Sequence, residues 1–201
     1  MNKVFKKEVL KLLPEYSYAN PFFYKGPVNH ILCGFCYNKV PSGLAWIHGG
    51  AYPLYSMEKK EHLSLSLSFT ERLCWIETKG ISDKTQASVF VKRIQAYQQQ
   101  VSLLQDLRYF TKVYAPSQPL NDREIIRRHI YVLNMIMLGE EEEAKRHLGL
   151  LLNSEYIAKD ERTRKIFLLD DVSEALSKGI DNAKNLLLNW EQENKRNFDI
   201  R

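Results

Sequence analysis

The chain has few cysteines and no long apolar stretch. Three cysteines among 201 residues are too few for a disulfide scaffold, and their odd number leaves one without a partner. No uninterrupted apolar run is long enough to cross a bilayer. The basic N-terminal segment also lacks the apolar block and cleavage site of a signal peptide. We therefore expect a cytoplasmic protein with reduced thiols and no membrane association.

A one-sided charge is also absent. The chain has 29 lysines and arginines against 24 aspartates and glutamates, a net charge of +5. Nucleic-acid-binding proteins usually gather basic residues into a block or stripe, whereas here they are scattered and, in the second half, interleaved with acids. This pattern favours a mixed, solvated surface, and it suits an acidic protein partner as well as a nucleic acid.

Motifs that commit a chain to one chemistry are missing too. The sequence has no glycine-rich phosphate loop, no Gly-x-Ser-x-Gly and no His-Glu-x-x-His. Cys33 and Cys36 have the spacing of a redox or zinc motif. They fall, however, in an alternating run typical of a strand, on which positions three apart point to opposite faces. We expect buried structural cysteines, no metal and no cofactor.

The first 80 residues predict a short helix followed by an antiparallel sheet. Apolar residues of 3–13 recur at three- and four-residue spacing, and Pro14 ends this helix. Residues 15–20 are expected to connect it to the sheet. The clearest strand signal is 63–70, in which Leu and Phe alternate with Ser and Thr. Further strands are expected at 22–25, 31–37, 44–55 and 74–76.

From residue 83 the spacing becomes helical. Asp83 followed by Gln86 is typical of a helix start, and the apolar seam after it predicts a helix that runs to 110 or 113. Two prolines within 115–119 mark a linker. The polar tail from Asn194 is expected to fray. Later helices are expected at 121–138, with Gly139 as C-cap, at 140–152, and from 170 or 171 onward. The pattern of residues 156–169 fits either a helix or a strand.

These patterns together predict an α+β protein. Residues 1–80 form an antiparallel sheet region with a leading helix, and residues 81–201 form a helical region. A division into domains at 115–120 is an alternative. One continuous fold is favoured, because helix faces this apolar need partners to cover them.

Aromatic residues of the sheet region are the first candidates for a binding surface. Trp46 and Trp75, with Tyr52 and Tyr55, could form an aromatic platform for a peptide or for bases, although packing in the core is favoured for Trp46. A Gly-Gly pair at 49–50 is expected to break or bulge the strand, and Pro53 indicates an edge or irregular position, which would expose the two tyrosines. Because aromatic and cationic side chains are common anchors of interfaces, the predicted contact surface for a partner is Tyr52, Tyr55, Lys59 and Lys60.

A family resemblance supports the same interpretation. The opening helix, Trp46, the segment 52–55 and the segment 69–73 resemble small uncharacterised bacterial proteins, some of whose relatives resemble immunity proteins that neutralise toxins. The resemblance covers the first third of the chain and implies a partner protein and no catalytic residues. We therefore predict a non-catalytic, cytoplasmic protein-binding module, in its most concrete form an immunity-type inhibitor of a toxin protein. The oligomeric state stays open.

Two other functions stay open as well. A nucleic-acid-binding protein would use the basic residues of the helical half, and an enzyme would use the histidines of the sheet region. For the histidines, no carboxylate or cysteine lies at a supporting metal-ligand or catalytic spacing. The basic set is Arg123, Arg127, Arg128, Lys145 and Arg146, and the histidine set is His30, His48 and His62.

Overall fold

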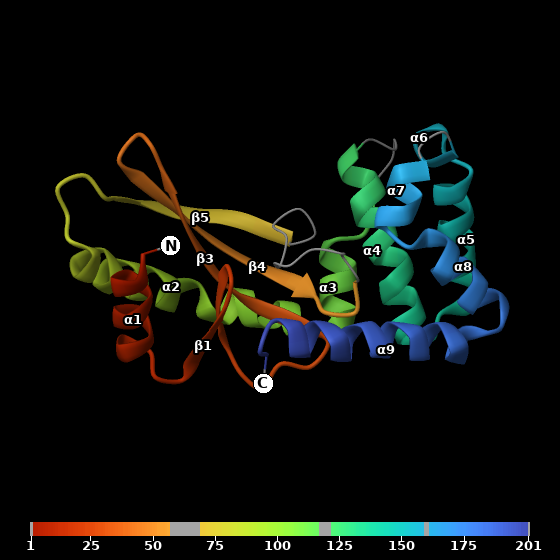
Figure 1. Cartoon of the computed structure of the whole chain (residues 1–201), viewed down its shortest axis with the longest axis horizontal. Helices are drawn as coiled ribbons and strands as arrows, with labels where there is room; N and C mark the ends of the chain where they lie inside the picture. The colour runs from red at the N-terminus through yellow and green to blue at the C-terminus, as the bar shows by residue number, and fades with distance from the viewer. Residues whose placement is uncertain (1, 57–68, 117–121, 159–160, 201) are drawn as a thin grey trace.

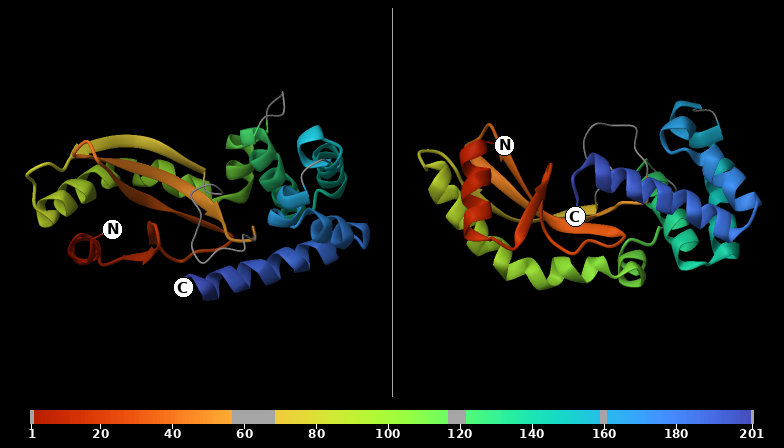
Figure 2. Two further views of the ribbon diagram at one scale, coloured as in Figure 1. Left: turned by 45° about the horizontal axis from the view of Figure 1, so that its top comes forward. Right: turned by 60° about the horizontal axis from the view of Figure 1, so that its bottom comes forward.

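The computed structural model describes residues 2–56, 69–116, 122–158 and 161–200. The molecule is elongated: the sheet and the first two helices form one end, and most of the later helices form the other (Figure 1). The last helix, α9 (Ile180–Asn197), starts in the helical end and runs back to the sheet (Figure 2). None of the described helices is both long and apolar enough to span a bilayer.

The described part of the sheet has five antiparallel strands in chain order, which confirms the α+β class and its sheet-first arrangement. The strands expected around 22–25, 31–37, 44–55 and 74–76 are present. Residues 15–20, expected to be a connector, instead contain β1, whose Tyr16 and Ala19 are buried and which pairs along its length with β2. The strands are β1 (Tyr16–Ala19), β2 (Phe22–Lys25), β3 (Ile31–Val40), β4 (Leu44–Pro53) and β5 (Phe69–Glu77).

The two faces of the sheet bury different side chains. On β3, Ile31, Cys33 and Phe35 belong to the main core beneath the first two helices, whereas Leu32 and Cys36 belong to a smaller core on the opposite face. Side chains of a strand alternate between its faces, which produces this separation. The prediction that the two cysteines point apart is confirmed, and both are free thiols.

The described helices follow the expected spacing but are more finely divided. α2 ends at Ser102, short of 110–113, because Asp106 has an extended backbone and caps α3 by accepting a hydrogen bond from the amide three residues on (2.7 Å). Gly179, at φ 109°, separates α8 from α9, which were expected as one helix. Gly139, at φ 80°, confirms the expected C-cap. The helices are α1 (Lys3–Leu12), α2 (Asp83–Ser102), the 3-10 turn η1 (Leu103–Gln105), α3 (Leu107–Val113), α4 (Asp122–Leu138), α5 (Glu141–Leu152), α6 (Glu155–Ala158), α7 (Glu161–Ile166), α8 (Leu169–Ser177) and α9 (Ile180–Asn197).

The C-terminal tail packs against the sheet. Asn194, expected to begin a frayed tail, is only 3% exposed. Its Nδ2 donates to the carbonyl oxygens of Leu54 (2.7 Å) and Ser56 (2.9 Å), just after β4 ends, and Ile200 is buried in the smaller core. The prediction of fraying is wrong, because a buried amide pairs with main-chain groups far away in the sequence.

Other expectations for the sheet have mixed outcomes. The alternating run at 63–70 lies outside the described residues up to 68, and β5 begins at Phe69. Gly49 and Gly50 do not interrupt β4; the ladder irregularity lies just before them, between Ile47 and His48. Pro53 does not mark an edge strand, because it is the last residue of β4, which lies between β3 and β5.

One cluster of buried side chains reaches from the sheet into the helical end. It includes Phe5 and Phe90 of the first two helices together with Leu133, Leu148 and Leu187 of α4, α5 and α9. Residues 117–121 of the expected division lie outside the described part of the chain. That the chain is one continuous fold stays a prediction, and this shared core is an argument for it.

Candidate functional site

Four side chains of β4 and β5, two of them exposed and two half-buried, lie together on one face of the sheet. Trp46 lies opposite Trp75, and His48 lies opposite Arg72. All four point away from α1 and α2, because His48 lies opposite Cys36 of the smaller core on the other face. We call these four residues the Trp–Arg patch.

An irregularity of β5 places Arg72 in this patch. Ile47 pairs with Cys74 and His48 pairs with Arg72, so Leu73 is the extra residue of a bulge. On a regular strand Arg72 and Trp75, three positions apart, would point to opposite faces. The bulge lets Leu73 pack on the main core and leaves Arg72 on the face of Trp75.

The patch is exposed, aromatic and cationic. The Trp75 side chain is 54% exposed, an unusual exposure for an indole. The Arg72 guanidinium carbon lies 4.9 Å from the centre of the Trp46 ring, which is a cation–π contact. That contact holds two long side chains in a defined geometry at the surface.

His48 adds a neutral group to the patch. Its pKa is lowered, first by burial and then by the positive charge of Arg72. Its Nε2 is buried and has no hydrogen-bond partner among the described residues. At neutral pH the patch therefore has one positive charge, that of Arg72, and no negative charge.

Two residues of the predicted contact surface are buried. Tyr52 and Tyr55 are 1% and 0% exposed, so the expectation that they are on exposed backbone is wrong. Tyr52 belongs to the smaller core, and the Tyr55 hydroxyl donates to Asn134 Oδ1 of α4 (2.5 Å). Their neighbours Lys59 and Lys60 lie outside the described residues.

The predicted basic set does not form a row of free charges. Arg127 pairs with Glu124 (3.4 Å), and Lys145 pairs with Glu141 (2.6 Å). Arg146 donates two hydrogen bonds to Glu143 (2.6 and 2.9 Å), and hydrogen bonding from that guanidinium is the main reason why the pKa of Glu143 falls to about 2. The remaining member with a described side chain is Arg128, which is 2% exposed and bonds to His147 (3.1 Å). The Arg123 side chain is outside the described part.

The predicted histidine set is dispersed. His30 precedes β3, and its Nδ1 lies 2.7 Å from Glu191 Oε2 of α9. His48 is in the middle of β4, opposite Cys36, and His62 lies outside the described residues. No three His, Cys, Asp or Glu side chains of the described residues are arranged to hold a metal ion.

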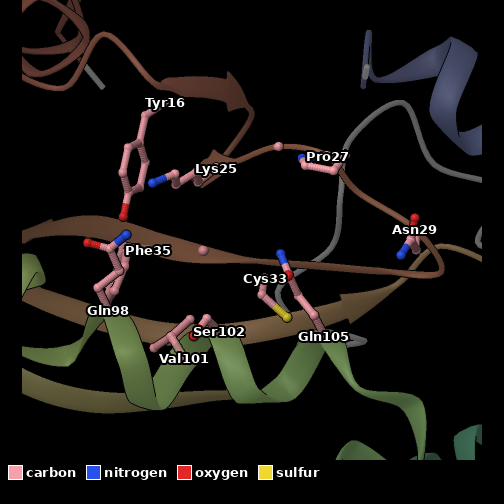
Figure 3. A pocket seen from close by; sticks show the side chains of 12 residues that line it. Tyr16, Lys25, Pro27, Asn29, Cys33, Phe35, Gln98, Val101, Ser102 and Gln105 are labelled. Atoms are coloured by element: carbon pink, nitrogen blue, oxygen red, sulfur yellow. The ribbon is translucent and has the colours of Figure 1, made fainter.

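A polar cleft of about 380 Å³ opens on the other face of the sheet, between β1, β2 and α2. In Figure 3 Tyr16 and Lys25 extend from the strands on one side, and Gln98 and Gln105 extend from the helical segment on the other. Nothing in the sequence indicated this cleft, because its walls are about 70 residues apart in the chain.

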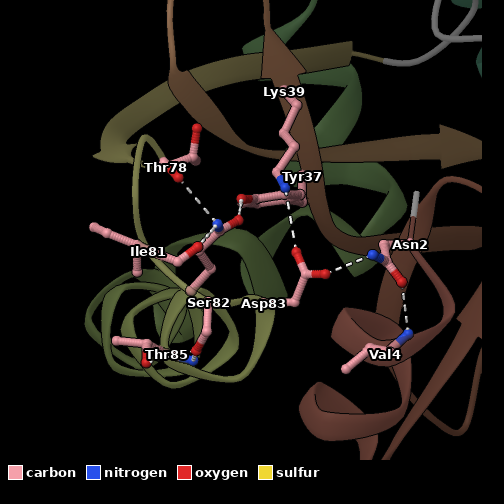
Figure 4. A network of polar contacts seen from close by, with 10 residues as sticks. Asn2, Val4, Tyr37, Lys39, Thr78, Ile81, Ser82, Asp83 and Thr85 are labelled. Atoms are coloured by element: carbon pink, nitrogen blue, oxygen red, sulfur yellow. Dashed lines mark hydrogen bonds and ion pairs between the residues drawn. The ribbon is translucent and has the colours of Figure 1, made fainter.

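A second polar cluster joins the starts of α1 and α2 (Figure 4). Asn2 caps α1, and its Nδ2 donates to Asp83 (2.5 Å). The cap of α2 is Ser82, one residue before the Asp83 that was expected to take this role. The buried Gln86 accepts from the Tyr37 hydroxyl (2.6 Å) and donates to two carbonyl oxygens of the preceding loop. These contacts satisfy helix ends and a buried amide, so we assign the cluster a structural role.

Comparison of the chain with models of known protein families, with curated proteins and with solved structures found no match.

Proposed function

We propose that the protein is a non-catalytic, cytoplasmic binding module that contacts a partner protein through the Trp–Arg patch, as an immunity-type inhibitor of a toxin would. The observation that carries the proposal is the exposed Trp75 indole, which lies beside Trp46. The Trp46 ring in turn makes the cation–π contact with Arg72. Trp and Arg are enriched among residues that dominate binding energy at protein interfaces. Covering the exposed part of one indole contributes about 2–3 kcal/mol.

The position of β5 supports the same proposal. β5 is an outer strand of the described sheet, paired with β4 on one side. The main-chain groups of an outer strand can pair with an extended segment of another protein, while the adjacent side chains select that segment. We propose an extended partner segment with apolar side chains over the two indoles and a carboxylate beside Arg72.

The patch favours a protein over a nucleic acid. Nucleic-acid affinity comes mainly from several phosphate contacts, and the patch has one cation. Of the basic residues on α4 and α5, Arg127, Lys145 and Arg146 are each paired with a carboxylate of their own helix. No specific observation favours the nucleic-acid function or an enzyme built on the histidines.

Substitution of Trp75 tests the proposal. Affinity capture from the host should identify a partner protein, and its affinity for the purified chain is then measured by calorimetry. Because Trp75 is the exposed indole of the patch, we expect Trp75→Ala to weaken binding at least tenfold, about 1.4 kcal/mol or more.

Leu150→Ala is the matched control. Leu150 is also an exposed apolar residue, 40% exposed, but it lies on α5 at the far end of the molecule. We expect its loss to leave the affinity unchanged. A partner that binds Trp75→Ala as tightly as the wild type would contradict the proposal. Capture of a nucleic acid whose affinity falls steeply with salt would replace it.

A further inference from the structure

The polar cleft between β1, β2 and α2 has the size of a small-molecule site. Its volume of about 380 Å³ lies within the usual range for such sites. Its floor includes the side chains of Cys33, Phe35 and Val101, which belong to the main core. The cleft is therefore on the face of the sheet opposite the Trp–Arg patch and is independent of it.

Polar side chains from two elements face one another across the cleft. Tyr16 and Lys25 are opposite each other on β1 and β2. Gln98 and Ser102 are on α2, and Gln105 is in η1. In Figure 3 the Lys25 ammonium lies beside the Tyr16 ring, whose hydroxyl points toward the Gln98 amide. The Gln105 amide extends from the helical segment toward β3, beside Cys33, and Asn29 lies on the loop between β2 and β3.

The charges of the lining select the charge of a ligand. Lys25 is the single charged side chain among the residues that line the cleft, and none of them is a carboxylate. Burial, and next the charge of Glu15, raise the pKa of Tyr16 to about 12, so its hydroxyl stays protonated and can donate. A ligand with one negative charge is therefore favoured over a neutral or cationic one.

The remaining polar groups select the ligand's neutral part. Each of the three amide side chains (Asn29, Gln98 and Gln105) offers both a donor and an acceptor. This combination matches an amide group, which also has one of each. The Cys33 thiol at the floor has its pKa raised by burial, so it stays protonated and is not a nucleophile. The lining therefore favours reversible binding without covalent chemistry.

We infer that this cleft binds a small organic carboxylate that also has amide groups, of the class of N-acylated amino acids. Its carboxylate pairs with the Lys25 ammonium and accepts from the Tyr16 hydroxyl. Its amide groups form hydrogen bonds with Gln98, Gln105 and Asn29, and its apolar part lies on Phe35 and Val101.

Two probes that differ in one charge test this inference on the full chain. N-acetylglycylglycine has a free carboxylate, and its C-terminal amide has the same size without the charge. Titration is followed by the backbone amide signals in NMR spectra. We expect saturable shifts with the carboxylate probe at millimolar concentration, centred on Lys25, Gln98 and Gln105. The amide probe should bind at least tenfold more weakly.

Variants then identify the residues involved. Lys25 is exposed, so Lys25→Met is expected to fold and to lose the tenfold preference for the carboxylate. Gln98→Leu is expected to weaken the binding of both probes. Lys79→Met, at an exposed position outside the cleft, is the control and should leave the binding of both unchanged. Three results would each overturn the inference. They are equal binding of the two probes, a preference for the carboxylate that persists in Lys25→Met, and no saturable shift up to about 50 mM. None of these results affects the proposal for the Trp–Arg patch.

Discussion

Glu191 of α9 is a carboxylate that the fold removes almost entirely from water. It is 3% exposed, and its two oxygens accept from His30 Nδ1 and Lys195 Nζ, each at 2.7 Å. Burial alone raises the pKa of this carboxyl, but the hydrogen bonds and charges of His30 and Lys195 outweigh burial, so its pKa is lowered. The charged form of Glu191 therefore stabilises the folded chain and fastens α9 to the loop before β3.

Glu191→Gln should reduce stability in a pH-dependent way. A carboxyl with a lowered pKa contributes stability above its ordinary value of about 4.5, and this contribution is lost as the pH falls through the lowered pKa of the folded state. We expect the variant to lose about 1–3 kcal/mol of unfolding free energy at pH 7 and less at pH 3. Urea unfolding of the variant and the wild type at pH 7 and pH 3 measures the two losses of unfolding free energy.

Glu174→Gln is the control for that experiment. Glu174 also pairs with a lysine four residues on, at 2.6 Å, but its side chain is 69% exposed. Exposed pairs of this kind add little to stability, so we expect almost no change in the urea midpoint. If the two variants were destabilised equally, the role given to burial at Glu191 would be wrong.

At the scale of elements, the junction of β4, β5 and α2 depends on the absence of one side chain. A Cβ at Gly49 would lie 2.6 Å from Val101 Cγ2 and 2.7 Å from Leu73 Cδ1. Leu73 is the extra residue of the β5 bulge, so the space at Gly49 is what lets this leucine reach the core. The bulge, and with it the position of Arg72, therefore depends on the space that Gly49 leaves for the Leu73 side chain.

Two glycine-to-alanine variants are predicted to change stability in opposite directions. Gly49→Ala forces Leu73 and Val101 to move, and we expect a loss of about 1–3 kcal/mol. Gly149, in the interior of α5, has open space where its Cβ would be, so Gly149→Ala is expected to add about 0.5–1 kcal/mol through helix propensity. Denaturant unfolding of both variants provides the check, and a fully stable Gly49→Ala would show that the junction has spare room.

At the scale of the whole molecule, the sheet and the helical end are joined by polar as well as apolar contacts. Tyr55, just after β4, bonds to Asn134 of α4, and Asn194 of α9 bonds to the carbonyl oxygens of Leu54 and Ser56. These partners are more than 70 residues apart in the sequence. All of them surround the end of β4, where α4 and α9 meet the sheet.

We predict that both ends of the molecule unfold in one transition. In a Trp190→Phe variant the remaining tryptophans are Trp46 and Trp75 of the sheet, so fluorescence reports on the sheet. Far-ultraviolet circular dichroism reports mainly on the helices. Because one buried cluster spans both ends, the two signals should give the same urea midpoint. Separate midpoints would indicate two domains that divide near residues 115–120.

Much of the fold was predictable because its signals are local. The alternation of Ile31, Cys33 and Phe35 with Leu32 and Cys36 assigned both faces of β3 correctly, since a strand needs nothing beyond its own neighbours to show this pattern. The end of α1 before Pro14 and the C-cap at Gly139 follow from backbone constraints of single residues. Trp75 was among the residues considered for an aromatic platform, whereas Trp46 was expected to pack in the core and is half-buried.

The rest of the site depends on pairs of residues far apart in the chain. Tyr55 is buried against α4, and Tyr52 lies in the smaller core with the C-terminal Ile200, while Asn194 of α9 bonds to the chain just after β4. The place of Arg72 beside Trp46 depends on the register of β5, and a shift of one residue would turn its guanidinium to the other face. The sequence by itself determined which elements form and which of their sides are apolar, because those properties depend on neighbouring residues. Only the tertiary structure decided which side chains stay exposed together, because register and docking are set by long-range contacts that no local pattern contains.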